Sequence, residues 1–204
     1  INDSQGEIAL CILSAINVGI CNTEKDIEEA CELAVRGLDS VIDEQEYVCP
    51  AAEIPATKRR PLGIGITNLA YYLAKQKRKY SDKESIKIVH DLQEMIQFYL
   101  LKASCKLAKE KGACEWFHKT KYAEGLLPID TYRRNVDELY PNVLNMDWEW
   151  LRAEIKKYGL RNSTLSAQMP CESSSVATNS TNGIDPVRTL IVEKRSKQRS
   201  LTQL

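Results

Sequence analysis

A stretch rich in hydroxyl side chains, MPCESSSVATNSTNGIDP, occupies residues 169–186. Clustered Ser and Thr hydroxyls and outward-facing backbone N–H groups can bind a phosphate without any lysine. Pro170 would end the strand-like run LRNSTLSAQM, because proline fixes φ and has no N–H to donate. Ligands of α/β proteins gather outside the carboxyl ends of strands. The residues alone leave two interpretations open: a phosphate-binding loop, or a solvated Ser/Thr linker.

Two glycines in the sequence GIG, Gly63 and Gly65, precede an expected helix and invite comparison with a nucleotide-binding loop. The full G-x-G-x-x-G pattern is absent because Asn68 occupies the third position, and no P-loop Lys-Ser/Thr follows. We therefore interpret these glycines as positions where a strand packs closely against a helix.

The cysteines are odd in number and contain no C-x-x-C pair: Cys11, Cys21, Cys31, Cys49, Cys105, Cys114 and Cys171. Only His90 and His118 could join the cysteines as metal ligands, and neither has a partner at metal-ligand spacing. We therefore expect no metal site. Cys11 lies in an apolar run, where a buried cysteine acting as a small hydrophobe is the ordinary interpretation. Abundant cysteine without a disulfide pattern favours a reducing, cytoplasmic setting.

The first half of the chain supplies the elements that would position these residues. Residues 7–21 contain a compact apolar stretch, typical of a buried strand followed by a turn at Gly19. Thr23, with an acidic residue three positions on, predicts the start of a helix of about five turns. Residues 48–65 contain three prolines and two glycines and predict a loop, whereas residues 66–75 predict a second helix.

The second half is mostly helical. A capping box of Ser81 and Glu84 would open the longest helix, which Gly112 would end. Residues 113–145 are irregular, and residues 147–158 predict a further helix.

Strand-like runs are few, and one of them is RTLIVEK at residues 188–194. Long helices that alternate with a few buried strands favour an α/β fold.

Composition excludes several classes of function. Lys plus Arg and Asp plus Glu both total 28, so the net charge is zero and we expect no direct nucleic-acid partner. Apolar runs are far shorter than the roughly 20 residues that span a bilayer, and no signal peptide is present, so we expect no membrane partner. The 204 residues can bury a real core, and the start at Ile1 suggests a segment of a longer protein.

The run from Trp148, WEWLRAEIKKYGLRNSTLSAQMP, follows the pattern W-x2-L-x7-G-L-R-N-x3-S-A-x2-P. This pattern resembles the signature of the large, catalytic subunit of ribonucleoside-diphosphate reductase, closest to its class I, oxygen-dependent branch. Three other stretches agree: ALCILSAINVG around Cys11, RRPLGIGITNLAYYLA from Arg59, and NGIDPVR from Asn182. The resemblance covers essentially the whole chain.

The resemblance implies that the chain is a helix-rich segment of a ten-stranded α/β barrel that reduces ribonucleoside diphosphates to deoxyribonucleoside diphosphates. In that family a cysteine thiyl radical removes the 3′ hydrogen, and a second pair of cysteines supplies reducing equivalents as water leaves the 2′ carbon. Cys11 matches one member of that reducing pair, which implies a catalytic role for it. A thiol at a strand end inside a barrel can close a disulfide without large movement.

The resemblance also assigns the hydroxyl-rich stretch to the substrate diphosphate, which loop amides and hydroxyls at the start of a helix would bind. The matching positions are Pro170, Cys171, Glu172, Ser173 and Ser174. Position 171 is often Ser or Thr in this family, so Cys171 is a departure. A backbone contact there would survive the change, whereas a hydroxyl contact would be lost.

Several segments of the family are absent from this sequence. They are the Asn-x-Cys-x-Glu strand with the radical cysteine, the disulfide partner of Cys11, the tyrosines of the radical path and the C-terminal shuttle cysteines. The N-terminal ATP cone and the specificity-regulating segment are also absent, so ATP and dNTP effectors would bind elsewhere. We expect residues 1–204 to be a partial catalytic barrel domain, inactive by itself, from an incomplete sequence or a split subunit.

The resemblance implies the partners as well. They would be the ribonucleoside diphosphate, the remaining part of the large subunit and a metal-containing small subunit that generates the radical, with the complete large subunit forming a homodimer. Electrons would come from thioredoxin or glutaredoxin, and this chain would bind no cofactor itself. Two other functions stay open: a non-catalytic nucleotide-binding module that keeps the phosphate loop, and a structural helical interaction module.

Overall fold

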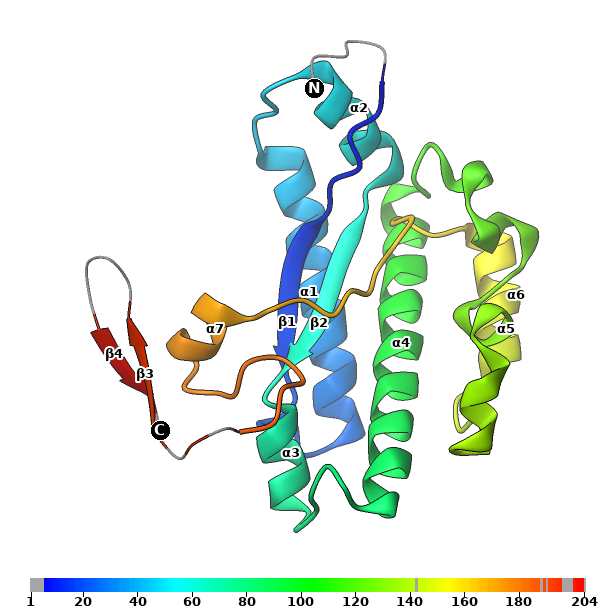
Figure 1. Ribbon diagram of the computed structural model, residues 1–204. Helices are drawn as coiled ribbons and strands as arrows, with labels where there is room; N and C mark the ends of the chain where they lie inside the picture. The colour runs from blue at the N-terminus through cyan, green and yellow to red at the C-terminus, as the bar shows by residue number, and fades with distance from the viewer. Residues whose placement is uncertain (1–5, 142, 188, 190, 196–199, 204) are drawn as a thin grey trace.

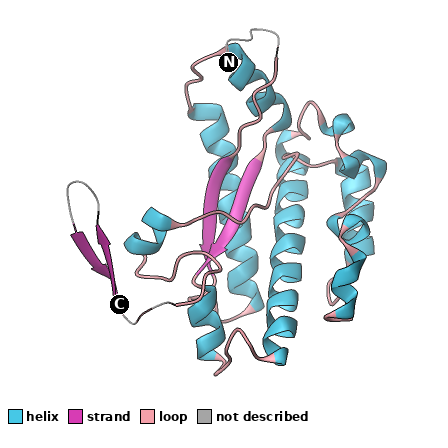
Figure 2. Ribbon diagram, viewed as in Figure 1, coloured by secondary structure: helices cyan, strands magenta, loops and turns pink. Residues whose placement is uncertain are grey.

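The computed structural model describes residues 6–141, 143–187, 189, 191–195 and 200–203, and helices predominate in it (Figure 2). The strands and helices in chain order are β1 (Ile12–Asn17), α1 (Glu24–Glu44), α2 (Pro50–Arg59), β2 (Leu62–Thr67), α3 (Leu69–Lys75), α4 (Lys83–Lys111), α5 (Pro128–Thr131), α6 (Trp148–Tyr158), α7 (Glu172–Ala177), β3 (Val192–Arg195) and β4 (Ser200–Gln203). Short 3₁₀ turns lie between α4 and α6 at Phe117–Lys119, Lys121–Glu124 and Arg134–Glu138.

The centre of the fold is the parallel pair β1 and β2, in register from Ile12 opposite Leu62 to Asn17 opposite Thr67. Parallel strands need a long crossover, which α1 and α2 provide. The chain after α6 runs parallel to β2 along its other edge, where the Ile64 N–H donates to the Leu165 carbonyl at 2.8 Å. The order across this small sheet is therefore β1, β2 and then the segment around residues 164–167.

Helices cover one face of the strands. Figure 1 shows α1 behind the two strands, with α4 beside α1 and α6 on the far side of α4. The contacts come from the apolar stripes predicted for these helices, including Ile27, Cys31 and Val35 of α1, Leu92, Ile96, Leu100 and Leu107 of α4, and Leu151 and Ile155 of α6. Each fully buried aliphatic side chain contributes about 1.5–3 kcal/mol, so this layer holds the sheet in place.

The opposite face of the strands is covered at β2 and partly exposed at β1. The chain leading to α7 crosses in front of the strands here (Figure 1), and Ala167 and Met169 of that segment lie against Gly63 and Gly65 of β2. Leu13 of β1, which points to the same side, is 52% exposed. The β1 side of this face is therefore where the sheet can meet a ligand.

Residues 48–65 do not form the predicted loop. Pro50 occupies the first turn of α2, where a missing N–H costs nothing, and α2 tolerates Pro55 as well. Residues 62–67 form β2, so the helix predicted over residues 66–75 begins only at Leu69. Every residue of β2 is buried, and a strand buried on both faces lacks the polar alternation that would have revealed it.

The GIG glycines lie inside β2. A Cβ on Gly63 would lie 2.6 Å from Leu13 Cδ2, and a Cβ on Gly65 would lie 2.4 Å from the Ala167 carbonyl oxygen. Close packing at these glycines is confirmed, but the predicted packing against a helix is wrong: the neighbours belong to β1, to Cys11 and to the segment after α6.

The helix ends agree with the sequence at most places. The capping box of Thr23 and Asp26 is present, and Gly112 ends α4 with a φ of 86°. The predicted box of Ser81 and Glu84 is wrong: Asp82 is the N-cap of α4, and its carboxylate accepts the Lys79 N–H at 2.8 Å to close the preceding turn.

The strand predicted at residues 188–194 corresponds to β3, which pairs antiparallel with β4. Residues 188 and 190 of that prediction lie outside the described residues. Figure 1 shows this hairpin apart from the rest of the chain.

Candidate active site

The hydroxyl-rich stretch lies at the carboxyl ends of the parallel strands, as the sequence predicted. The Cys171 thiol lies 3.8 Å from the carbonyl oxygen of Ile66, near the end of β2. The Thr67 hydroxyl, at the last residue of β2, donates to the Thr181 carbonyl at 2.6 Å. Residues 172–177 form α7 and are therefore not an irregular linker. The stretch is folded against the sheet edge where α/β proteins bind their ligands.

Ser173 and Ser174 are adjacent exposed donors in the first turn of α7. Within the described part of the chain, neither backbone N–H has an acceptor, as is usual in the first turn of a helix. The Ser174 hydroxyl makes a long contact of 3.4 Å with the Cys171 carbonyl. Pro170, which is also exposed, leads directly into them. Two N–H groups and two hydroxyls are thus presented to solvent from adjacent residues.

The Cys171 side chain, unlike those of Ser173 and Ser174, points into the protein. The residue is 4% exposed, and its thiol lies 3.4 Å from the Met169 carbonyl oxygen. Burial raises the pKa of the Cys171 thiol, which therefore stays protonated near neutral pH. Its backbone N–H donates to Asn182 Oδ1 at 2.5 Å. Replacing a family hydroxyl by this thiol thus removes no group from the exposed surface of the stretch.

A set of asparagines that the sequence interpretation missed holds this region together. Asn182 Nδ2 donates to Glu172 Oε1 at 2.8 Å. Asn68 has a left-handed φ of 72°, and its Oδ1 accepts the Thr181 N–H at 3.2 Å. Asn68 Nδ2 donates to Asn17 Oδ1 at 2.9 Å, at the end of β1. The available signals were the NGIDPVR motif and Asn in place of the third glycine, because Asn tolerates left-handed backbone.

Cys11 directly precedes β1 and is exposed, so the interpretation as a buried hydrophobe is wrong. Its Sγ lies 3.4 Å from the place that a Cβ would take at Gly63, on the face of the strands away from α1. Met169 Sδ approaches the corresponding place at Gly65, two residues closer to the carboxyl end. Side chains two residues apart share a face of a strand, so Cys11 and Met169, which precedes Pro170, lie on the same side of β2.

Cys11 also lines a cavity of about 640 Å³ at the amino end of the strands. The polar part of its wall includes Arg59, Lys119, Lys121 and Thr164. Arg59 is paired with Glu7 at 3.0 Å. The thiol is therefore accessible from solvent through a partly basic opening.

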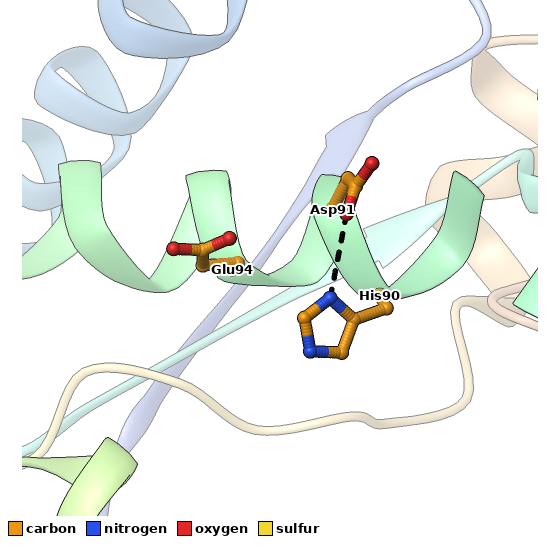
Figure 3. Close-up of side chains that lie close together, drawn as sticks. All are labelled: His90, Asp91 and Glu94. Atoms are coloured by element: carbon orange, nitrogen blue, oxygen red, sulfur yellow. Dashed lines mark hydrogen bonds and ion pairs between the residues drawn. The ribbon is translucent and has the colours of Figure 1, made fainter. Parts of the chain in front are cut away.

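One cluster of metal-ligand type occurs within the described chain, at His90, Asp91 and Glu94 (Figure 3). Its members lie on one turn of α4, where His90 Nδ1 is 3.4 Å from Asp91, and the sequence interpretation overlooked this spacing. Glu94 Oε1 already accepts the N–H groups of Asn145 and Met146 at 2.8 and 3.0 Å. The same oxygen accepts the indole N–H of Trp148 at 3.0 Å. We assign this carboxylate to holding the chain before α6.

Parallel strands joined by helical crossovers, with helices packed on one face, define a helix-rich segment of an α/β barrel. The chain belongs to the family described as ribonucleotide reductase, barrel domain. The model of this family matches residues 1–204.

Individual relatives agree with this assignment. The chain is 55% identical over 204 residues to the ribonucleoside-diphosphate reductase subunit alpha of Buchnera aphidicola subsp. Baizongia pistaciae, covering 100% of this chain and 27% of that protein. It is 53% identical over 163 residues to the ribonucleoside-diphosphate reductase 1 subunit alpha of Escherichia coli K12, covering 80% of this chain and 21% of that protein. The ribonucleoside-diphosphate reductase subunit alpha of Enterobacteria phage T4 is 45% identical over 207 residues, covering 100% of this chain and 27% of that protein. The chain thus spans about a quarter of the length of these relatives.

No helix in the described part of the chain is long and apolar enough to cross a membrane.

Proposed function

We propose that this chain is the part of a ribonucleoside-diphosphate reductase large subunit that binds the substrate diphosphate and supplies one of the two reducing thiols. The observation that carries the proposal is the arrangement at the two ends of the parallel strands: the exposed thiol of Cys11 precedes β1, and the exposed Ser173 and Ser174 belong to a stretch held against the carboxyl end of β2. A nucleotide bound across the strands would have its phosphates at the carboxyl end and its sugar toward Cys11.

Residues 170–174 would bind the diphosphate. The N–H groups and hydroxyls of Ser173 and Ser174 are neutral donors, which suit a phosphate that must also leave as product. Pro170 fixes the backbone where the strand segment ends. Cys171 would contribute to the shape of the turn, since its thiol is buried. Glu172 would contribute through its backbone, because a carboxylate repels a phosphate.

Cys11 would act as a reductant. A thiyl radical on a cysteine outside this chain would remove the 3′ hydrogen of the ribose. Cys11 and a second thiol would then be oxidised to a disulfide, releasing two electrons and two protons. One hydrogen takes the place of the hydroxyl at the 2′ carbon, and the hydroxyl leaves with the other proton as water. The cysteine that took the 3′ hydrogen would then return it to the 3′ carbon and become a thiyl radical again. The product is the deoxyribonucleoside diphosphate, and thioredoxin or glutaredoxin would reduce the disulfide again.

The proposed enzyme is allosteric and cytoplasmic, and it makes DNA precursors. This chain would work with the remaining part of the large subunit, as a homodimer, and with a small subunit that contains the metal and generates the radical. The many cysteines support a reducing compartment.

Reconstitution tests the proposal. The chain would be mixed with polypeptides that supply the rest of the large subunit and with the small subunit, and CDP reduction would be followed. Cys11→Ser should abolish turnover with the reductase's own electron donor. Cys49→Ser is the matched control, because Cys49 is the N-cap of α2, where Ser is favourable.

Two outcomes would favour the other functions. Unchanged CDP reduction by the Cys11→Ser complex would favour a non-catalytic nucleotide-binding module. Unchanged CDP affinity after replacing Ser173 and Ser174 together by Ala would favour a structural helical module. A wild-type chain that does not associate with the other pieces would overturn the proposed role in the enzyme.

A further inference from the structure

Asn182 is placed to control the shape of the phosphate loop, which is defined here as residues 170–174. Its side chain makes two hydrogen bonds to adjacent residues of the loop: Oδ1 accepts the Cys171 N–H at 2.5 Å, and Nδ2 donates to Glu172 Oε1 at 2.8 Å.

Asn182 is itself fixed to the sheet. The residue before it, Thr181, has its N–H bonded to Asn68 Oδ1 at 3.2 Å, and its carbonyl accepts the Asn68 N–H at 3.0 Å. The same carbonyl accepts the Thr67 hydroxyl at 2.6 Å. The loop is thus joined through Asn182 to the last residues of β2, across eleven residues of sequence from Cys171.

The two bonds have different consequences for a bound anion. The first occupies the Cys171 N–H and sets the direction of the N–H groups that follow it. The second holds the Glu172 carboxylate at the Asn182 amide. A carboxylate free to approach the N–H groups of Ser173 and Ser174 would compete with a diphosphate for these donors and repel it.

We infer that Asn182 is a positioning residue for the diphosphate of the substrate: it fixes the loop backbone and holds the Glu172 carboxylate away from the anion. The inference rests on the function proposed for the loop. Asn182 lies outside the phosphate loop. It would change the affinity for the substrate's phosphates without contacting the reacting atoms.

The test uses the reconstituted complex, with CDP as substrate, and compares four forms: wild type, Asn182→Ala, Asn135→Ala, and Asn182→Ala combined with Glu172→Gln. Asn135 is the matched control because it is an exposed asparagine far along the chain from the loop. Asn182→Ala should raise KM and the Kd for CDP about tenfold, the equivalent of one hydrogen bond to a charged group, with kcat little changed. Adding Glu172→Gln should restore part of that affinity, because the side chain that has lost its bond to Asn182 is then neutral and no longer repels the diphosphate.

The outcomes separate this inference from the proposed function. A wild-type KM in the Asn182→Ala complex overturns the inference alone, provided that Ser173→Ala still weakens CDP binding. A fall in kcat with no rescue by Glu172→Gln means that Asn182 serves folding only, which also overturns it. A wild-type complex that does not bind CDP overturns the proposed function of the loop and the role of Asn182 with it.

Discussion

Asp39 and Arg60 form a buried ion pair, in which Arg60 Nε donates to Asp39 Oδ1 at 2.6 Å and the two side chains are 0% and 6% exposed. The same carboxylate accepts Asn162 Nδ2 at 3.1 Å and Arg161 Nε at 3.3 Å. It therefore joins α1 to the turn before β2 and to the segment that runs along β2. Arg161 and Asn162 belong to the GLRN part of the sequence signature, and this structure gives them an architectural role.

Asp39→Asn should destabilise the chain by about 3 kcal/mol, because removing one member of a buried pair leaves the other charge uncompensated. The measurement is the free energy of unfolding in urea. Asp43→Asn is the control, since Asp43 pairs with the same arginine at 2.7 Å but is 44% exposed. It should cost at most about 1 kcal/mol. Equal losses in the two variants would show that burial of the pair is not the determining factor.

Glu94→Gln should lower stability by about 2 kcal/mol, because one carboxylate oxygen that accepts from the Asn145 side chain becomes a competing donor. Thermal unfolding followed by tryptophan fluorescence reports this directly, since Trp148 donates to Glu94. Glu149→Gln, at a side chain that is 77% exposed, serves as the comparison and should have little effect. A Glu94 variant as stable as wild type would contradict the role assigned to this carboxylate.

Gly65→Ala should destabilise the fold by about 1–3 kcal/mol, because the added methyl group would lie 2.4 Å from a backbone oxygen, which has little freedom to move. Gly37→Ala provides a control of opposite sign. Gly37 lies within α1 with nothing within 4 Å of an added Cβ, so alanine there should stabilise the helix by roughly 0.5–1 kcal/mol. Chemical denaturation of both variants gives the comparison, and a harmless Gly65→Ala would argue against close approach of the segment along β2.

The free energy of unfolding should fall as the pH rises above the ordinary pKa of a cysteine thiol. Burial raises the pKa of Cys31 from 9.0 to about 12, and that of Cys105 to about 11. Above pH 9.0 these thiols lose protons in the unfolded state but keep them in the folded state, so proton release favours unfolding. The stabilisation is fully present below the thiol pKa of the unfolded state. It is lost progressively as the pH rises to the thiol pKa of the folded state.

Each such thiol should contribute a slope of about 1.4 kcal/mol per pH unit over this range. The free energy of unfolding measured at several alkaline pH values tests this. Cys105→Ala should make the slope shallower, because the variant lacks one thiol whose pKa burial raises. Identical slopes for Cys105→Ala and wild type would contradict the assignment.

The sequence predicted those elements whose signals are local. The helices α1, α4 and α6 have apolar stripes and glycine or capping signals at their ends, and they occur where the pattern places them. β2 was missed because its apolar residues do not alternate with polar ones, and its glycines and the preceding prolines look like a loop. The hydroxyl-rich stretch does lie at a strand end, but the end is that of β2; the run before Pro170, expected to be a strand, forms only an isolated bridge at Ser166.

The contacts that hold the site together could not be read from the sequence. Asn68, Thr181 and Asn182 meet only because β2 and the segment after α7 lie side by side, which no local pattern specifies. The exposure of Cys11 likewise depends on which face of the sheet the helices cover. Only the resemblance to a known family singled out Cys11 from the other cysteines.

Gly63 and Gly65 leave one face of β2 without side chains, so the segment that leads from α6 to the hydroxyl-rich stretch packs directly against peptide backbone. This close approach depends on strand register. A shift of β2 by one residue would turn Ile64 and Ile66 from the core onto this face, because successive side chains point to opposite sides. In misregistered molecules two isoleucines would displace that segment, so correct pairing of β1 with β2 is a condition for placing the hydroxyl-rich stretch as well as for folding.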